Sequence, residues 1–238
     1  MAAIAIGATM WGALHRRRVE GATPGERIGS IRRLAEEKPR GAGQALAEEA
    51  VSAADPSVRH SALVALGRFV EPRHRAAVEQ GTRDASPEVR AAAAATLGLY
   101  GDAPAADRLG EMATSDPELK VRIGAVRGLG RNKCSKATAW LVRSAEKEND
   151  DKVQFHALIE LCEKFGTRYI GPEPSKAKDW KREATALVEF LKGNPKVQEA
   201  YHEASWPLEL RPEYFRDEHE RHSRDEHERH GGARAPGP

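Results

Sequence analysis

Four histidines near the C-terminus have the spacing best suited to chemistry. His219 and His222, and again His227 and His230, stand three residues apart in a segment that occurs twice in succession. In a helix this spacing places each pair of imidazoles on one face, and imidazole is a common ligand of Zn²⁺ and Ni²⁺. The pairs could therefore hold a metal ion weakly. The alternative is a charge-balanced, disordered tail over residues 211–238, because the repeated segment contains no apolar residue to bury.

The rest of the sequence contains no catalytic motif. There is no Gly-rich phosphate loop, no His-Glu-x-x-His and no nucleophile elbow. The two cysteines, Cys134 and Cys162, make no disulfide framework, and Cys162 is expected to be a small buried thiol. The chain has 38 basic and 36 acidic residues, so its net charge of +2 gives no strong field to recruit nucleic acid. We therefore expect neither an enzyme nor a bound cofactor.

The chain is organised by a motif whose clearest copy is Asp55–Gly67. Counting from its arginine, Arg59, apolar residues follow at three, four and seven positions and a glycine at eight. This spacing predicts one stripe of an α-helix followed by a stop signal, and the preceding Asp-Pro predicts the helix start. The same frame recurs 31 or 32 residues apart, with anchor positions Arg27, Arg59, Arg90, Arg122 and Gln154. A fixed period of this length is typical of stacked supersecondary units.

A short breaker and a second apolar-periodic segment follow each motif. These second segments are predicted near 42–53, 73–82, 104–114 and 135–147. Each unit is therefore a helix–turn–helix pair, which buries its apolar stripe only by stacking against its neighbours.

The motif Asp-Pro-x-Val-Arg-x-x-Ala-Leu-x-x-Leu-Gly resembles the HEAT repeat, especially the short variety of phycobilisome-lyase-type HEAT proteins. The resemblance covers about residues 23–193. It implies an all-α fold, a right-handed α-solenoid of about five repeats, near 23–53, 55–83, 86–115, 116–148 and 150–193. In such families the anchor arginines pack at the seam between repeats, near the aspartate of a neighbouring unit. We therefore expect these arginines to be structural.

The two ends of the chain differ from the repeats. Residues 1–14 are apolar and uncharged, and Arg16–Arg18 follow directly. The run is shorter than the about 20 residues of a membrane-spanning helix, and a secretory signal would carry its charge first. Residues 1–18 could be the end of a membrane anchor, a partly inserted segment, or a helix that caps the solenoid at 19–193. Residues 194–210 are predicted to form the C-terminal cap.

The second helices are the predicted binding elements, because the resemblance implies that they line the concave side of the solenoid. The shared period places Leu46, Val78, Leu109 and Leu141 at one buried level. The flanking columns give the candidate partner-binding residues Glu48, Gln80, Arg108, Glu111, Trp140 and Arg143. A tryptophan beside an arginine is the kind of pair that anchors partner contacts. The alternative for Trp140 is that it fills the stack between repeats four and five.

These observations predict a monomeric, non-catalytic scaffold or adaptor that binds a protein or peptide on its concave face. The expected location is the cytoplasm, with membrane association through residues 1–18. The resemblance also admits a bilin-lyase-like HEAT subunit, although no residue marks a chromophore site. A second alternative is nucleic-acid binding, suggested by basic residues interleaved with Trp180, namely Lys176, Lys178, Lys181 and Arg182.

Overall fold

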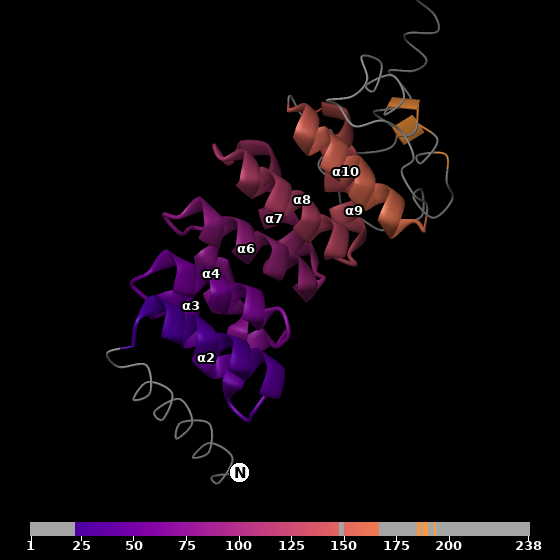
Figure 1. The fold of residues 1–238 in the computed structure, drawn as a ribbon. Helices are drawn as coiled ribbons and strands as arrows, with labels where there is room; N and C mark the ends of the chain where they lie inside the picture. The colour runs from indigo at the N-terminus through magenta and orange to yellow at the C-terminus, as the bar shows by residue number, and fades with distance from the viewer. Residues whose placement is uncertain (1–21, 148–149, 167–184, 187, 190–192, 194–238) are drawn as a thin grey trace, which may run out of the picture.

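The computed structural model describes residues 22–147, 150–166, 185–186, 188–189 and 193. These residues form α-helices and two short 3₁₀ helices, with no strand among them (Figure 1). The predicted all-α solenoid is confirmed. The segments predicted at 1–18 and 194–238, with the four tail histidines, lie outside the described residues, as does the basic segment around Trp180. No helix in the described part of the chain is long and apolar enough to cross a membrane.

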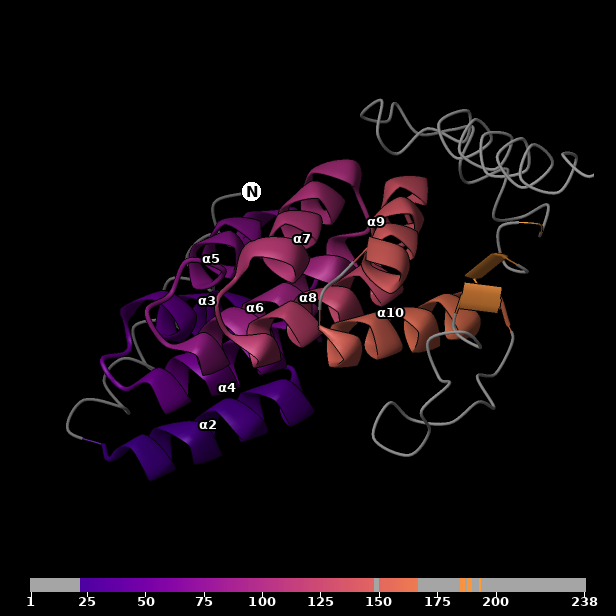
Figure 2. The ribbon, with the colours of Figure 1, turned by 90° about the horizontal axis from the view of Figure 1, so that it is seen from above.

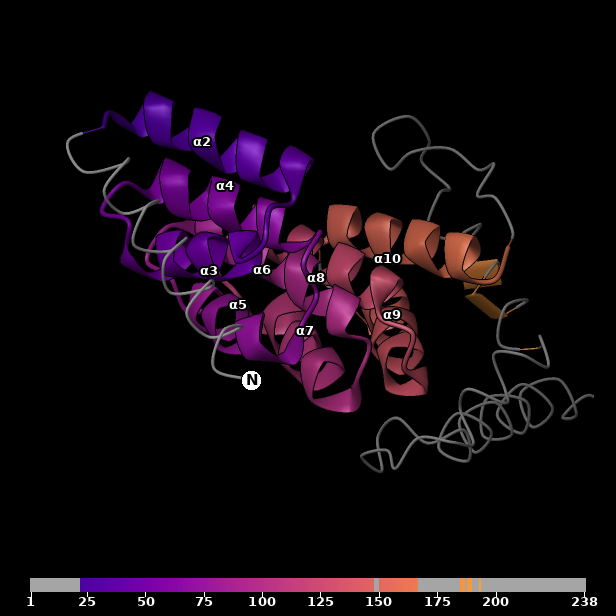
Figure 3. The same ribbon diagram turned by 90° about the horizontal axis from the view of Figure 1, so that it is seen from below.

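The helices stack in two rows, which Figures 2 and 3 show from opposite sides. The first helices of the repeats form one row: α2 (Pro24–Glu37), α4 (Pro56–Leu66), α6 (Pro87–Leu97), α8 (Leu119–Arg131) and α10 (Asp151–Lys164). The second helices form the other: α3 (Ala42–Ser52), α5 (Arg75–Gly81), α7 (Ala103–Ser115) and α9 (Ser135–Lys147). Two 3₁₀ helices, η1 (Pro72–His74) and η2 (Gly98–Tyr100), lie in the turns within repeats.

Side-chain caps fix the N-termini of α2, α4, α6 and α10. The start of α8 differs from the Asp-Pro prediction, since this helix begins at Leu119 and its N-cap Glu118 makes no side-chain hydrogen bond. Thr23 forms a reciprocal capping box with Glu26 at the start of α2. At α4 the carboxylate of Asp55 accepts a hydrogen bond from the Ser57 N–H at 2.7 Å, and Pro56 occupies the first turn. The second segment predicted at 73–82 differs in detail, since η1 fills its first turn and α5 begins only at Arg75.

The core lies between the two rows and is built largely from alanine, leucine and valine. Leu46, Val78, Leu109 and Leu141 are each 0% exposed, which confirms the buried level predicted from the period. Cys162 is buried, as expected for a small apolar thiol. Rows of such close-packed side chains hold each helix pair against the next.

The backbone of α8 approaches α6 and the adjoining η2 so closely that glycine is required. A Cβ added at Gly128 would lie 2.5 Å from the carbonyl oxygen of Ala94. One added at Gly98 would lie 2.1 Å from the carbonyl oxygen of Gly128. The backbones therefore meet without intervening side chains, and larger residues at these positions would force the helices apart.

Side chains of one repeat also donate hydrogen bonds to backbone carbonyls at the C-terminal end of the first helix of the preceding repeat. These carbonyls have no partner within their own helix, so a donor from the next repeat both caps the helix and fixes the stacking. The pairs are Arg68 to the Ala35 oxygen at 3.3 Å, Thr96 to the Leu63 oxygen at 3.0 Å, Arg131 to the Ala95 oxygen at 3.3 Å, and Lys164 to the Asn132 oxygen.

Candidate partner-binding surface

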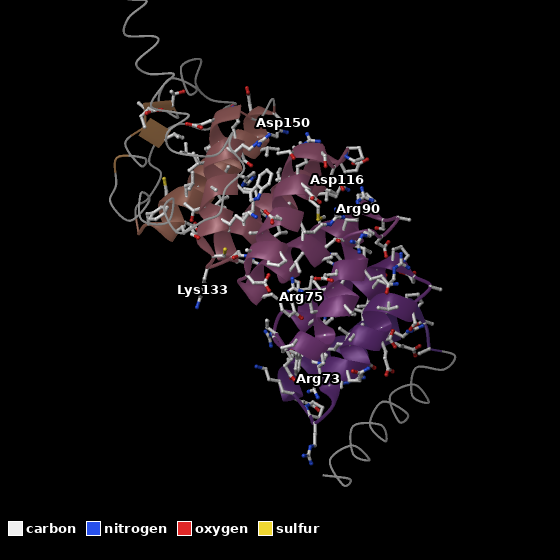
Figure 4. The ribbon with its side chains drawn as sticks, turned by 180° about the vertical axis from the view of Figure 1, so that it is seen from behind. Arg73, Arg75, Arg90, Asp116, Lys133 and Asp150 are labelled. Atoms are coloured by element: carbon white, nitrogen blue, oxygen red, sulfur yellow. The ribbon has the colours of Figure 1, made fainter. Side chains whose placement is uncertain are left out.

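The anchor arginines form a ladder along one edge of the solenoid, where Figure 4 labels Arg90, Asp116 and Asp150. The guanidinium of Arg59 donates to both carboxylate oxygens of Asp84, at 2.8 Å each, and to the carbonyl oxygens of Ala53 and Ala54 at 2.9 Å. Arg90 repeats the arrangement one unit later, with Asp116 at 2.9 and 3.0 Å. Each arginine thus joins the turn before its own helix to the turn before the next.

The ladder changes at its two ends. Arg122 donates to Asp150 at 3.0 Å. Arg27 instead pairs with Glu49, because Ala53 occupies the position that Asp84 and Asp116 hold in later repeats. The Nε of Arg27 is buried and has no hydrogen-bond partner among the described residues. The first rung is therefore less complete than the two that follow it.

Contacts within the ladder shift the pKa values of its aspartates and arginines. Hydrogen bonds from Arg59 hold the pKa of Asp84 below its ordinary value, and the same contacts raise the pKa of Arg59. Burial acts to raise the pKa of Asp116, but the hydrogen bonds from Arg90 and the Glu118 N–H, together with the charges of Arg90 and Arg122, outweigh it and lower that pKa. The charged forms of both partners are the stable ones, so the anchor arginines are structural, as predicted.

The predicted columns on the second helices lie on four successive helices of one row. Gln80 on α5 and Glu111 on α7 are exposed, while Glu48 on α3 is half-buried and accepts a hydrogen bond from Gln44 at 3.3 Å. Arg108 on α7 is held by Thr82, which accepts from it through its hydroxyl and its carbonyl oxygen, each at 3.2 Å. These residues stay candidates, since their position fits the prediction but no partner is present.

Trp140 on α9 lies at the centre of a group of interacting side chains on this row. Its half-buried indole N–H donates to the carboxylate of Asp107 at 3.3 Å. The indole covers Gly110, where an added Cβ would lie 2.1 Å from the ring. The guanidinium of Arg143 lies over the ring, 5.4 Å from its centroid, and Lys136 pairs with Asp107 at 2.6 Å. The ring is thus fixed on three sides by named contacts.

The alternative position predicted for Trp140, between repeats four and five, concerns a neighbouring second segment that lies largely outside the described residues; within the described residues the indole contacts α7. Asp107 and Gly110 belong to α7, so this contact joins repeats three and four. The physical reason is that α9 packs along α7, and the missing side chain of Gly110 leaves room for the ring. The sequence carries a signal for this contact, since an isolated glycine inside a helix often marks a close approach.

A second group of charged residues, on α8 and α10, was not identified from the sequence. Burial lowers the pKa of Lys164, and burial together with Glu163 raises the pKa of Glu160. Burial, followed by the charge of Arg127, lowers the pKa of His156. Lys164 caps α8 through the Asn132 carbonyl, which gives the group a structural role. Among the described residues, no cluster of three or more His, Cys, Asp or Glu side chains could hold a metal ion.

The stacked helix pairs and their seams define the chain as an α-solenoid. Residues 43–123 match the family model of HEAT repeats, which covers α3 through the start of α8. The predicted resemblance to HEAT repeats is confirmed over this stretch. The finer resemblance to phycobilisome-lyase-type proteins stays a prediction. No curated protein of known function matches the chain.

Proposed function

We propose that this α-solenoid is a non-catalytic scaffold or adaptor that binds a protein or peptide on the row of second helices. The proposal includes a monomeric, cytoplasmic protein without a cofactor. HEAT repeats generally serve protein interaction, which supports the coarse role. The finer role depends on the surface that α7 and α9 present to the solvent.

The observation that carries the proposal is the fixed aromatic group around Trp140. Interfaces gain most of their affinity from a few tryptophan, tyrosine and arginine side chains. A side chain already held in place loses little conformational entropy on binding. Trp140 meets both conditions, since Asp107, Gly110 and Arg143 fix its ring while part of it stays open to the solvent.

Binding should be tested with two charge-reversal variants of equal charge change. Arg143→Glu removes the cation over the indole, while Arg83→Glu changes an exposed arginine in the turn after α5. Partners captured from the native cell should be purified and their affinity measured by calorimetry. We expect Arg143→Glu to weaken binding at least about tenfold and Arg83→Glu to leave it unchanged. Circular dichroism melting of both variants checks the fold.

Trp140→Ala provides the second arm of this test. It should weaken the same complex by about 2 kcal/mol or more if the indole is an anchor. Equal affinities for the wild type, Arg143→Glu and Trp140→Ala would refute the proposed surface.

A coloured adduct on co-expression with a bilin and an acceptor protein would instead support the bilin-lyase alternative. Nucleic-acid binding would be recognised by an affinity that falls steeply with salt.

A further inference from the structure

Three turns within the repeats form one continuous strip along the edge opposite the ladder. We call this strip, residues 67–75, 98–102 and 130–136, the basic edge. Its first two turns meet where the Tyr100 hydroxyl donates to the Glu71 carbonyl at 3.3 Å and the Arg75 guanidinium lies 5.6 Å from the Tyr100 ring centroid. The last two meet where the Asn132 side chain donates to the Asp102 carbonyl at 3.1 Å. The strip therefore acts as one surface.

The basic edge carries a concentrated positive charge. Its three turns contain six basic residues and two acidic residues, Glu71 and Asp102. The facing segments between repeats, 52–57, 82–88 and 115–120, contain five acidic and two basic residues. Three anchor arginines reach into those segments and bring their formal charge from −3 to zero, while Glu79 and Asp107, which pair with Arg75 and Lys136, bring that of the basic edge from +4 to +2. The molecule is therefore polarised across its width, although its net charge is only +2.

Two cations of this edge, Arg73 and Lys133, point away from the core. The other four are held by the fold: Arg68 and Arg131 donate to backbone carbonyls, and Arg75 and Lys136 pair with carboxylates. Figure 4 shows Arg73, Arg75 and Lys133 along one long side of the solenoid, with Arg90, Asp116 and Asp150 along the other. The Arg73 side chain is 62% exposed although it pairs with Glu71, and Lys133 is exposed. Since helices pack about 10 Å apart, the three turns span roughly 20 Å. A flat anionic surface could meet them together.

Apolar side chains lie among these cations. Val70 is 40% exposed and Leu99 is 37% exposed, two of the four large apolar residues that stand out on the described surface. Leu99 lies beside Gly67 of the neighbouring turn, 3.3 Å from where a Cβ would stand. Cations with interspersed apolar side chains are typical of protein surfaces that rest in the headgroup region of a membrane.

We propose that the basic edge docks on an anionic lipid surface. A phosphate backbone alone would leave Val70 and Leu99 uncovered, so the apolar residues favour lipid over nucleic acid. The sequence supplies an independent argument, because the apolar residues 1–14 and Arg16–Arg18 are typical of a membrane-directed segment. Weak anchoring elements commonly act in pairs, and the edge would provide the second.

Co-sedimentation of the full chain with vesicles tests the proposal. The vesicles are phosphatidylcholine alone and phosphatidylcholine mixed with phosphatidylserine. The variant Arg73→Glu/Lys133→Glu is compared with Arg83→Glu/Lys152→Glu, which makes the same charge change at exposed positions on the opposite edge. Each basic residue near an anionic leaflet strengthens binding about fivefold. We expect the first variant to bind anionic vesicles at least about 20-fold more weakly, and the second to bind like the wild type.

Several outcomes would overturn the proposal. Equal binding by the wild type and both variants would mean that residues 1–18 act alone. Equal loss in both variants would indicate a non-specific charge effect. Fluorescence anisotropy with a short RNA would exclude lipid if Arg73→Glu/Lys133→Glu lost RNA binding but kept vesicle binding. Val70→Ser should weaken the vesicle binding that persists at high salt, and unchanged binding would remove the apolar part of the argument.

Discussion

Removing the Asp84 carboxylate should destabilise the solenoid more than removing any exposed acid of the same repeat. The side chains of Arg59 and Asp84 are only 16% and 13% exposed, and two hydrogen bonds of 2.8 Å join them. Asp84→Ala leaves a partly buried guanidinium without its counter-ion. It also removes the acceptor for the Ser86 N–H, which bonds Asp84 at 2.9 Å.

The expected cost follows from these two losses. Breaking a fully buried ion pair by truncating one partner costs about 3–5 kcal/mol. Arg59 keeps its bonds to the Ala53 and Ala54 carbonyls, and water reaches part of the pair, so the lower part of that range applies. With the lost bond to Ser86, we expect Asp84→Ala to lower the free energy of unfolding by about 3 kcal/mol.

Urea denaturation followed by circular dichroism measures this cost, and Glu88→Ala is the matched control. Glu88 also stands near the start of α6, but its pair with Lys120 has side chains 56% and 51% exposed, so solvent screens it and its loss should cost clearly less than that of Asp84. The double variant Arg59→Met/Asp84→Leu removes both charges and should be more stable than Asp84→Ala. The reasoning is refuted if Asp84→Ala costs no more than Glu88→Ala.

The same pair predicts a pH dependence. Because Arg59 lowers the pKa of folded Asp84, the pair contributes its full stability above the unfolded pKa of about 3.9. That contribution is lost as the pH falls through the folded pKa, where the carboxylate takes up a proton. The difference between the wild type and Asp84→Ala should therefore be constant near neutral pH and shrink below about pH 4. A difference that grew on acidification would contradict the assigned role.

Three substitutions test the packing and the ladder elsewhere, each by urea denaturation. Gly128→Ala should cost about 2–3 kcal/mol, because the new methyl would lie 2.5 Å from a backbone oxygen of α6. Gly29→Ala, in the α2 interior with nothing within 4 Å, should instead stabilise by about 0.5–1 kcal/mol, and equal effects would contradict the packing argument. Ala53→Asp should complete the first rung by offering Arg27 Nε an acceptor and stabilise by about 1 kcal/mol; a loss would mean that Glu49 already fills the site.

The repeat period of the sequence predicts most of the fold, because each repeat forms its helices and buries its apolar stripe in the same way. The spacing after Arg59 predicts the helix, its cap and its buried stripe, and the structure confirms all three. The predicted level containing Leu109 and Leu141 is likewise fully buried. These features depend on residues within one unit, so the hydrophobic pattern alone contains the information.

Contacts between repeats are harder to predict, because they depend on the residues of the neighbouring repeat, such as a glycine whose absent side chain leaves room for a large one. The position of Trp140 follows from the glycine at 110 and the carboxylate of Asp107, thirty or more residues away. The period predicts that residue 140 faces a neighbouring unit, but it does not predict which unit the indole contacts. The partner-binding columns stay predictions for the same reason, since the contacts of exposed residues such as Gln80 and Glu111 depend on a second molecule.

The distribution of cations separates the two roles of arginine in this solenoid. On the edge between repeats, Arg59, Arg90 and Arg122 each bind a carboxylate and two carbonyl oxygens, so the stacking itself accounts for them. On the opposite edge, Arg73 pairs with an exposed glutamate of its own turn, and Lys133 extends into the solvent. Cations that the fold does not require cost little to replace. Charge reversal there should therefore change binding while leaving the unfolding free energy within about 0.5 kcal/mol of wild type.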